Sequence, residues 1–89
     1  QIFLHKQLRA VMEPIVDQHS IDLRVTEDDR VFVTDHFTLA ILGHISQWLA
    51  TGMSTDPYIL TERIARVLDG QVRRSLELFA SSPHPPARA

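Results

Sequence analysis

The stretch FTLAILGHISQWLATGMSTDPYILTERIARVLDG, residues 37–70, decides the fold of this chain. A long apolar segment comes first, and residues 51–54 (TGMS) interrupt it. Asp56 then precedes Pro57 at the start of a second amphipathic segment. That pair is a strong signal for a helix start, because the N–H that proline lacks would be unpaired in the first turn anyway. The stretch therefore predicts two helices joined by a tight turn, with Gly52 where a left-handed C-terminal cap is needed.

The first of these helices, expected over residues 29–51, carries more apolar surface than one packing partner needs. Gly43 inside a helix costs ~1 kcal/mol relative to alanine. The close approach of a neighbouring backbone is a reasonable motive for placing it there. We therefore expect this helix to serve both a domain core and a second subunit. Its wide apolar stripe consists of Phe37, Ile41, Leu42, Ile45, Trp48 and Leu49, while Phe32, Leu39, Gly43 and Ala50 lie on a different side.

A second helix is expected over residues 56–70. Past Gly70 the same helical phase continues through residues 72–79. Gly70 is therefore either tolerated inside one long helix or separates two shorter ones, and we favour continuation. The apolar face consists of Leu60, Ile64, Val67 and Leu68 before Gly70, and of Val72, Leu78 and Phe79 after it.

Residues 2–19 place apolar side chains at spacings of three and four, the period of a helix with one buried stripe. Pro14 lies inside this pattern, and because its ring crowds a carbonyl one turn earlier we expect a kink near it. The polar segment 20–30 is predicted to connect this helix to the next. The stripe consists of Leu4, Leu8, Val11, Met12, Ile15 and Val16, and the candidate caps of the next helix are Thr26, Asp28 and Asp29.

The composition is that of one small globular domain, with 89 residues of which 44% are hydrophobic and 22% charged. Because a core this small gives a thin stability margin, association with another chain is a usual remedy. The net charge is −2 and the nine Lys and Arg residues are spread out, which argues against DNA contact by this segment. The lack of cysteine excludes disulfides and thiolate metal sites and fits a cytoplasmic location. No apolar run approaches the ~20 residues of a membrane span, so we expect no membrane contact.

The two ends of the chain differ in character. Residues 2–4 already belong to an apolar helical pattern with no cap ahead of them. We therefore expect the chain to start partway through a helix, with more protein upstream. Residues 81–89, SSPHPPARA, hold three prolines and are expected to form an extended tail. This divides the chain into a helical region over residues 1–80 and a Pro-rich tail over residues 81–89.

The spacing of apolar, glycine and Asp-Pro positions resembles the C-terminal end of a TetR-family transcriptional regulator. The resemblance covers roughly residues 1–70 and is specific from about residue 37 to residue 70, as a pattern of helix, tryptophan, glycine turn and Asp-Pro start. The positions that carry it are Leu39, Ala40, Ile41, Leu42, Gly43, Ile45, Trp48, Leu49, Gly52, Met53, Ser54, Asp56, Pro57, Leu60, Ile64, Val67, Leu68 and Gly70.

The resemblance implies an all-α homodimer in which the last two long helices pair with their copies as a four-helix bundle. Residues 29–51 and 56–70 would form this antiparallel hairpin, and residues 2–19 would lie near an effector pocket. The family's DNA-reading helix-turn-helix, and the early helices that supply most of the pocket, are expected upstream of this chain. The implied partners are a second copy, an unknown small-molecule effector and, through the upstream domain alone, operator DNA. The implied dimer interface is Leu39, Gly43, Ile45, Trp48, Leu60, Ile64, Val67 and Leu68, and the candidate effector residues are Phe3, Gln7, Leu8, Val11 and Met12.

Each candidate effector residue taken singly is better explained as plain core, because a periodic apolar stripe discriminates poorly between the two roles. Trp48 can either close a pocket or anchor packing between helices, and we favour packing. His36 and His44 are ~12 Å apart along a helix axis, too far to chelate one ion, so we expect no metal or cofactor. The acids at residues 27–29 fit helix capping better than paired-acid chemistry.

No serine lies in a GxSxG context. We therefore expect no catalytic residue and no enzymatic activity. Four arginines, Arg63, Arg66, Arg73 and Arg74, are expected to form a solvated face of the last helix.

The leading interpretation is the C-terminal dimerisation and effector-binding region of a ligand-responsive transcriptional regulator. The alternative is a self-standing helical dimerisation or protein-docking module without a ligand. A helix-turn-helix of ~45–50 residues upstream would support the first, and its absence would support the second.

Overall fold

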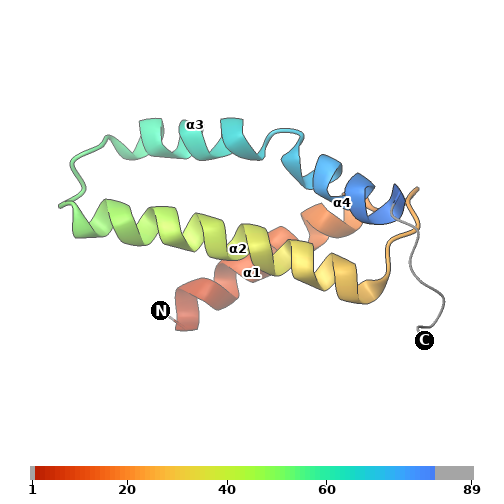
Figure 1. Cartoon of the computed structure of the whole chain (residues 1–89). Coiled ribbons are helices and arrows are strands. Elements are labelled where there is room, and N and C mark those ends of the chain that lie inside the picture. The colour runs from red at the N-terminus through yellow and green to blue at the C-terminus, as the bar shows by residue number, and fades with distance from the viewer. Residues whose placement is uncertain (1, 82–89) are drawn as a thin grey trace.

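The computed structural model describes residues 2–81, and its regular elements in that range are four α-helices (Figure 1). The predicted all-α class is thereby confirmed. Helices α2 and α3 form an antiparallel hairpin, α1 crosses behind α2, and α4 returns toward the end of α1 (Figure 1). Of the predicted tail, residues 82–89 lie outside the described residues. The helices are α1 Ile2–His19, α2 Glu27–Ala50, α3 Pro57–Leu68 and α4 Gln71–Ser81.

The helix ends follow from the side chains at their caps. Thr26 caps α2, because its hydroxyl accepts a hydrogen bond from the Asp29 N–H at 3.1 Å. Asp56 caps α3 by accepting from the Tyr58 N–H at 2.8 Å, with proline in the first turn. Gly52, with φ of +76°, ends α2 in the left-handed conformation that favours glycine. The predicted Asp-Pro start and glycine stop are both confirmed.

The favoured continuation of one helix through Gly70 is wrong. Helix α3 ends at Leu68, and Gly70 has φ of +78°, a left-handed conformation that no helix interior adopts. The apolar period persists across the break because α4 has a core face of its own. On that face Val72 and Leu76 are buried.

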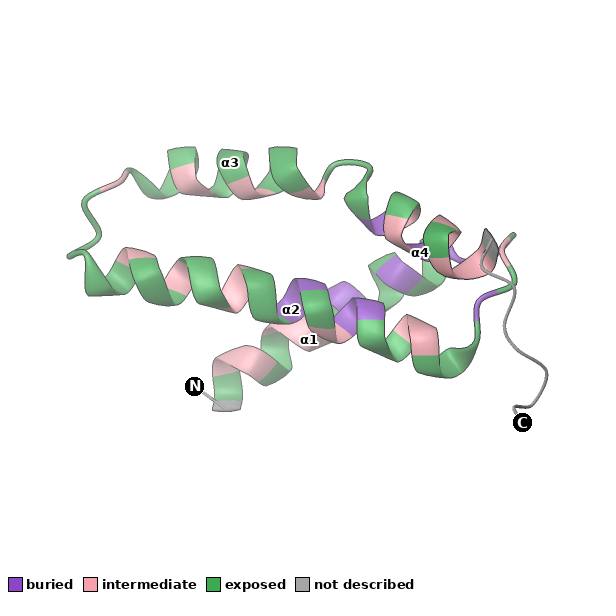
Figure 2. Cartoon of the chain, viewed as in Figure 1, coloured by how far each residue is buried: buried purple, intermediate pink, exposed green. Residues whose placement is uncertain are grey.

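The core lies between the second half of α1, the first half of α2, and α4 (Figure 2). Thr34 and Thr38 are also buried on α2, where each hydroxyl donates to the carbonyl four residues earlier. Of the predicted stripe on α1, Val11 and Ile15 are exposed instead. The buried apolar residues are Met12, Val16, Val25, Val33, Phe37, Val72 and Leu76.

The hairpin extends away from this core. In the described chain, α3 has no buried residue, and α2 has none beyond Thr38. The radius of gyration is 15.2 Å, against about 12 Å for a compact domain of this length. The molecule measures 49 × 25 × 19 Å along its principal axes. The outer hairpin therefore gains little stabilisation from the rest of the chain.

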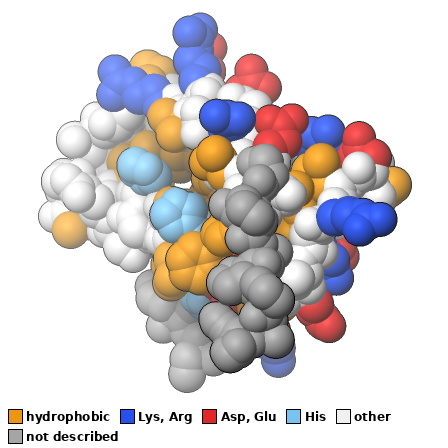
Figure 3. All heavy atoms as spheres, turned by 45° about the vertical axis from the view of Figure 1, so that its right-hand side comes forward, with side chains coloured by type: hydrophobic (Ala, Val, Ile, Leu, Met, Phe, Trp, Pro, Cys, Tyr) orange, Lys and Arg blue, Asp and Glu red, His pale blue; other side chains and the backbone are white. Residues whose placement is uncertain are grey.

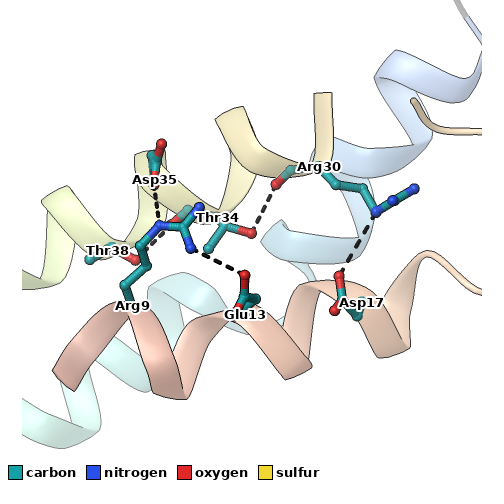
Figure 4. Close-up of polar contacts among 7 residues, drawn as sticks. All are labelled: Arg9, Glu13, Asp17, Arg30, Thr34, Asp35 and Thr38. Carbon is teal, nitrogen blue, oxygen red and sulfur yellow. Dashed lines mark hydrogen bonds and ion pairs between the residues drawn. The ribbon is translucent and has the colours of Figure 1, made fainter. Parts of the chain in front are cut away.

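Ion pairs fasten α1 to α2 (Figure 4). The Arg9 guanidinium donates to Asp35 at 2.7 Å and to Glu13 at 3.2 Å. The hydrogen bond with Asp35 is the main reason that the pKa of Arg9 is raised. Further along α1, the Nε of Arg30 on α2 lies 3.9 Å from the Asp17 Oδ1. These contacts fix how α1 lies against the buried half of α2.

Candidate dimer face and effector cavity

The residues predicted to form the dimer interface all lie on the hairpin, and none of them is buried within the described chain. Val67 is 65% exposed, and Leu39 and Gly43 are also exposed. The rest are half-buried. We call this set the hairpin face: Leu39, Gly43, Ile45, Trp48, Leu60, Ile64, Val67 and Leu68.

Gly43 lies beside open space. Among the described residues, a methyl group at its Cα would have no atom within 4 Å beyond its chain neighbours and the backbone of its own helix. The close backbone approach that its presence suggests is therefore not made within residues 2–81 of this chain. A neighbour from outside the chain has room to make it.

Trp48 bridges the turn of the hairpin. Its indole N–H donates to the Thr55 carbonyl at 2.7 Å, and its ring is half-buried. The side chain therefore links the end of α2 to the segment that leads into α3. This contact agrees with a packing role and leaves part of the ring uncovered.

An open cavity of about 690 Å³ is lined by residues from all four helices. Two predicted effector residues line it: Met12, which is 3% exposed, and Val11, which is 61% exposed. Phe3, Gln7 and Leu8 do not line it. We call this space the effector cavity, and its lining is Val11, Met12, Ile15, His19, Ile41, Glu62, Ala65, Arg66, Leu68, Asp69, Gly70, Val72 and Arg73.

The α3 side of the cavity was not predicted. Glu62, Ala65, Arg66 and Asp69 recur at spacings of three and four, so they share one face of that helix. This face is largely polar, and apolar periodicity reports only the other one. The sequence feature that could have indicated this wall is a small alanine, Ala65, between charged residues. That pattern is common on any solvated helix, so it does not distinguish a cavity wall from an exposed face.

A smaller hollow of about 240 Å³ lies between α2, α3 and α4 and is lined by both His36 and His44. Figure 3 shows histidine side chains among hydrophobic ones on the molecular surface. The His36 ring contacts Phe37 edge-to-face with centroids 5.1 Å apart. Across residues 2–81, no group of three or more His, Cys, Asp or Glu residues is placed to hold a metal ion.

The geometry defines a small all-α domain with an unburied helical hairpin and a cavity beside it. A TetR-type family model, described as "Transcriptional regulator C-terminal region", matches residues 1–70. The chain belongs to this family, the C-terminal region of TetR-family transcriptional regulators. The match includes α1, α2 and α3 and stops before α4.

No curated protein and no solved structure matches the chain. None of the helices in the described part of the chain combines the length and the apolar character that a membrane span requires.

Proposed function

We propose that this chain is the dimerisation and effector-binding portion of a ligand-responsive transcriptional regulator. The hairpin face carries the proposal, because none of its residues is buried by the described part of this chain, although the half-buried Leu68 also packs against the core. Burial of apolar area contributes roughly 25 cal/mol per Å², and contiguous exposed apolar patches mark interaction sites. Two copies pair through their hairpin faces as a four-helix bundle.

The effector cavity binds the ligand. Its walls are mainly apolar, with a few charged groups at the α3 side, which is the composition of small-molecule sites. Val11 and Ile15, which are exposed on α1, contact the apolar part of the ligand.

Helix α3 connects the two functions. Ala65 and Arg66 line the effector cavity, while Ile64 and Val67 belong to the hairpin face. A ligand that binds one position of α3 better than another shifts the population of paired arrangements. In the whole regulator this shift changes the spacing of two upstream DNA-binding domains and so their affinity for operator DNA. We place this regulator in the cytoplasm and expect no catalytic activity from it.

The test uses the regulator that contains this chain and a fluorescent operator duplex. Ile64→Asp places a charge on the hairpin face, and we expect operator affinity to fall at least ~10-fold because binding as a dimer is lost. Ile21→Asp is the matched control, since Ile21 is exposed in the connection before α2. Unchanged operator affinity in a folded Ile64→Asp variant contradicts the proposal. So does operator binding by the 89-residue chain alone.

A further inference from the structure

The effector cavity has apolar walls and a small set of charged groups, and these groups differ in how far they are neutralised. Its apolar lining comes mainly from Val11, Ile15, Ile41 and Val72. Such walls fit an apolar ligand body. The charged groups in the lining select for the polar group of the ligand. They are Glu62, Arg66, Asp69 and Arg73.

Arg73 has little capacity left for a ligand. Its Nη1 donates to Asp22 at 2.7 Å and to the His19 carbonyl at 2.8 Å. Its Nη2 donates to Asp22 at 3.2 Å, and its Nε donates to Glu77 at 3.1 Å. Two carboxylates therefore already balance the one positive charge.

Arg66 and Glu62 neutralise each other. The Arg66 Nη2 lies 3.5 Å from the Glu62 carboxylate, one helical turn away. Both side chains are mainly exposed, so the pair is weak but its net charge is zero.

Asp69 is different. Its backbone N–H donates to the Ala65 carbonyl, but its carboxylate forms no hydrogen bond or ion pair with the part of the chain that the structure describes. The C-terminus of α3 and the N-terminus of α4 meet here, and their opposite partial charges offset each other. The negative charge that remains in the cavity is therefore the Asp69 carboxylate.

We infer that the effector cavity takes an apolar ligand with one cationic amine group, which pairs with Asp69. The inference rests on the proposed effector function and adds the chemical class of the ligand. An apolar carboxylate is disfavoured because its candidate partners, Arg66 and Arg73, already face acidic groups.

The experiment compares three probes that share one ring system: naphthylmethylammonium, naphthylmethanol and naphthoate. Each is titrated into the 89-residue chain by calorimetry, and methyl NMR shifts at Ile15 and Ala65 locate the binding. We expect the ammonium probe to bind about two- to fivefold more tightly than the alcohol, as an exposed ion pair allows. Naphthoate should bind no more tightly than the alcohol.

Variants isolate the charge. Asp69→Asn should lower ammonium affinity to that of the alcohol, whereas Asp28→Asn, which changes an exposed carboxylate outside the cavity, should not. Arg66→Gln should raise ammonium affinity because it releases Glu62. Tightest binding of naphthoate, lost in Arg66→Gln, overturns the inference, as does the absence of binding by all three probes. Equal binding of all three also overturns it but leaves the proposed effector function in place.

Discussion

Arg73 of α4 donates two hydrogen bonds, of 2.7 and 3.2 Å, to the carboxylate of Asp22, which lies in the connection between α1 and α2. The same guanidinium reaches the His19 carbonyl at the end of α1 at 2.8 Å. Arg73 therefore departs from the solvated arginine face that the sequence predicts. It ties the last helix to the start of the chain and fixes α4 over the core.

Replacing Arg73 by lysine tests this fork, the pair of hydrogen bonds from one guanidinium to the Asp22 carboxylate. Lysine keeps the charge but cannot make two parallel hydrogen bonds to one carboxylate. We expect Arg73→Lys to lower the melting temperature and to speed amide exchange in α4. Arg74→Lys is the control, since Arg74 lies 3.8 Å from Glu77 and makes no such fork. Equal melting temperatures for the two variants would show that the fork contributes nothing.

The same contact predicts a pH dependence. The hydrogen bond from Arg73 lowers the pKa of Asp22 below its usual value of 3.8. Because the folded-state pKa is depressed, the stabilisation is present above pH ~4 and is lost as the pH falls toward the folded value. Urea unfolding of Asp22→Asn should therefore show a smaller loss of stability below pH ~4 than the unmodified chain. Parallel pH profiles would contradict this assignment.

Leu76 and Leu78 give a matched pair on α4. Leu76 is fully buried, whereas Leu78 is exposed. We expect Leu76→Ala to cost ~2–5 kcal/mol of unfolding free energy, through lost burial and a cavity. Leu78→Ala should cost far less in urea unfolding at the same chain concentration. A similar cost for both would mean that α4 does not pack as described.

Gly43→Ala has effects of opposite sign on folding and on pairing. Inside one chain the new methyl meets open space, so the helix gains ~1 kcal/mol of propensity. In a dimer with a close approach at Gly43, the methyl separates the helices and weakens association. We expect a higher dissociation constant by sedimentation together with an unchanged or higher helix content by circular dichroism. An unchanged or lower dissociation constant would exclude a close approach at Gly43.

Local signals predicted the helix ends well because caps are set by neighbouring residues. The side-chain oxygens of Thr26 and Asp56 accept hydrogen bonds from backbone N–H groups within three residues, so their capping roles can be predicted from the sequence. The hairpin turn at Gly52 can be predicted for the same reason, because it depends on the local backbone conformation of one glycine.

The change of chain direction at Gly70 and the contacts between residues far apart in the sequence were harder to predict. An apolar period that continues past Gly70 predicts one helix, but the chain turns at Gly70 and the structure has the separate helices α3 and α4. Nothing local indicates that Arg73 pairs with Asp22, 51 residues earlier. The same limit applies to Asp69, whose place in the effector cavity depends on how the fold brings residues of α1, α3 and α4 around one hollow.

Sedimentation equilibrium of the 89-residue chain tests the central claim most directly. The account predicts a concentration-dependent approach to twice the chain mass of 10.1 kDa, with Ile64→Asp held at the single-chain mass and Ile21→Asp behaving as the unmodified chain. A folded chain that stays at 10.1 kDa at all concentrations would contradict the pairing of two hairpin faces.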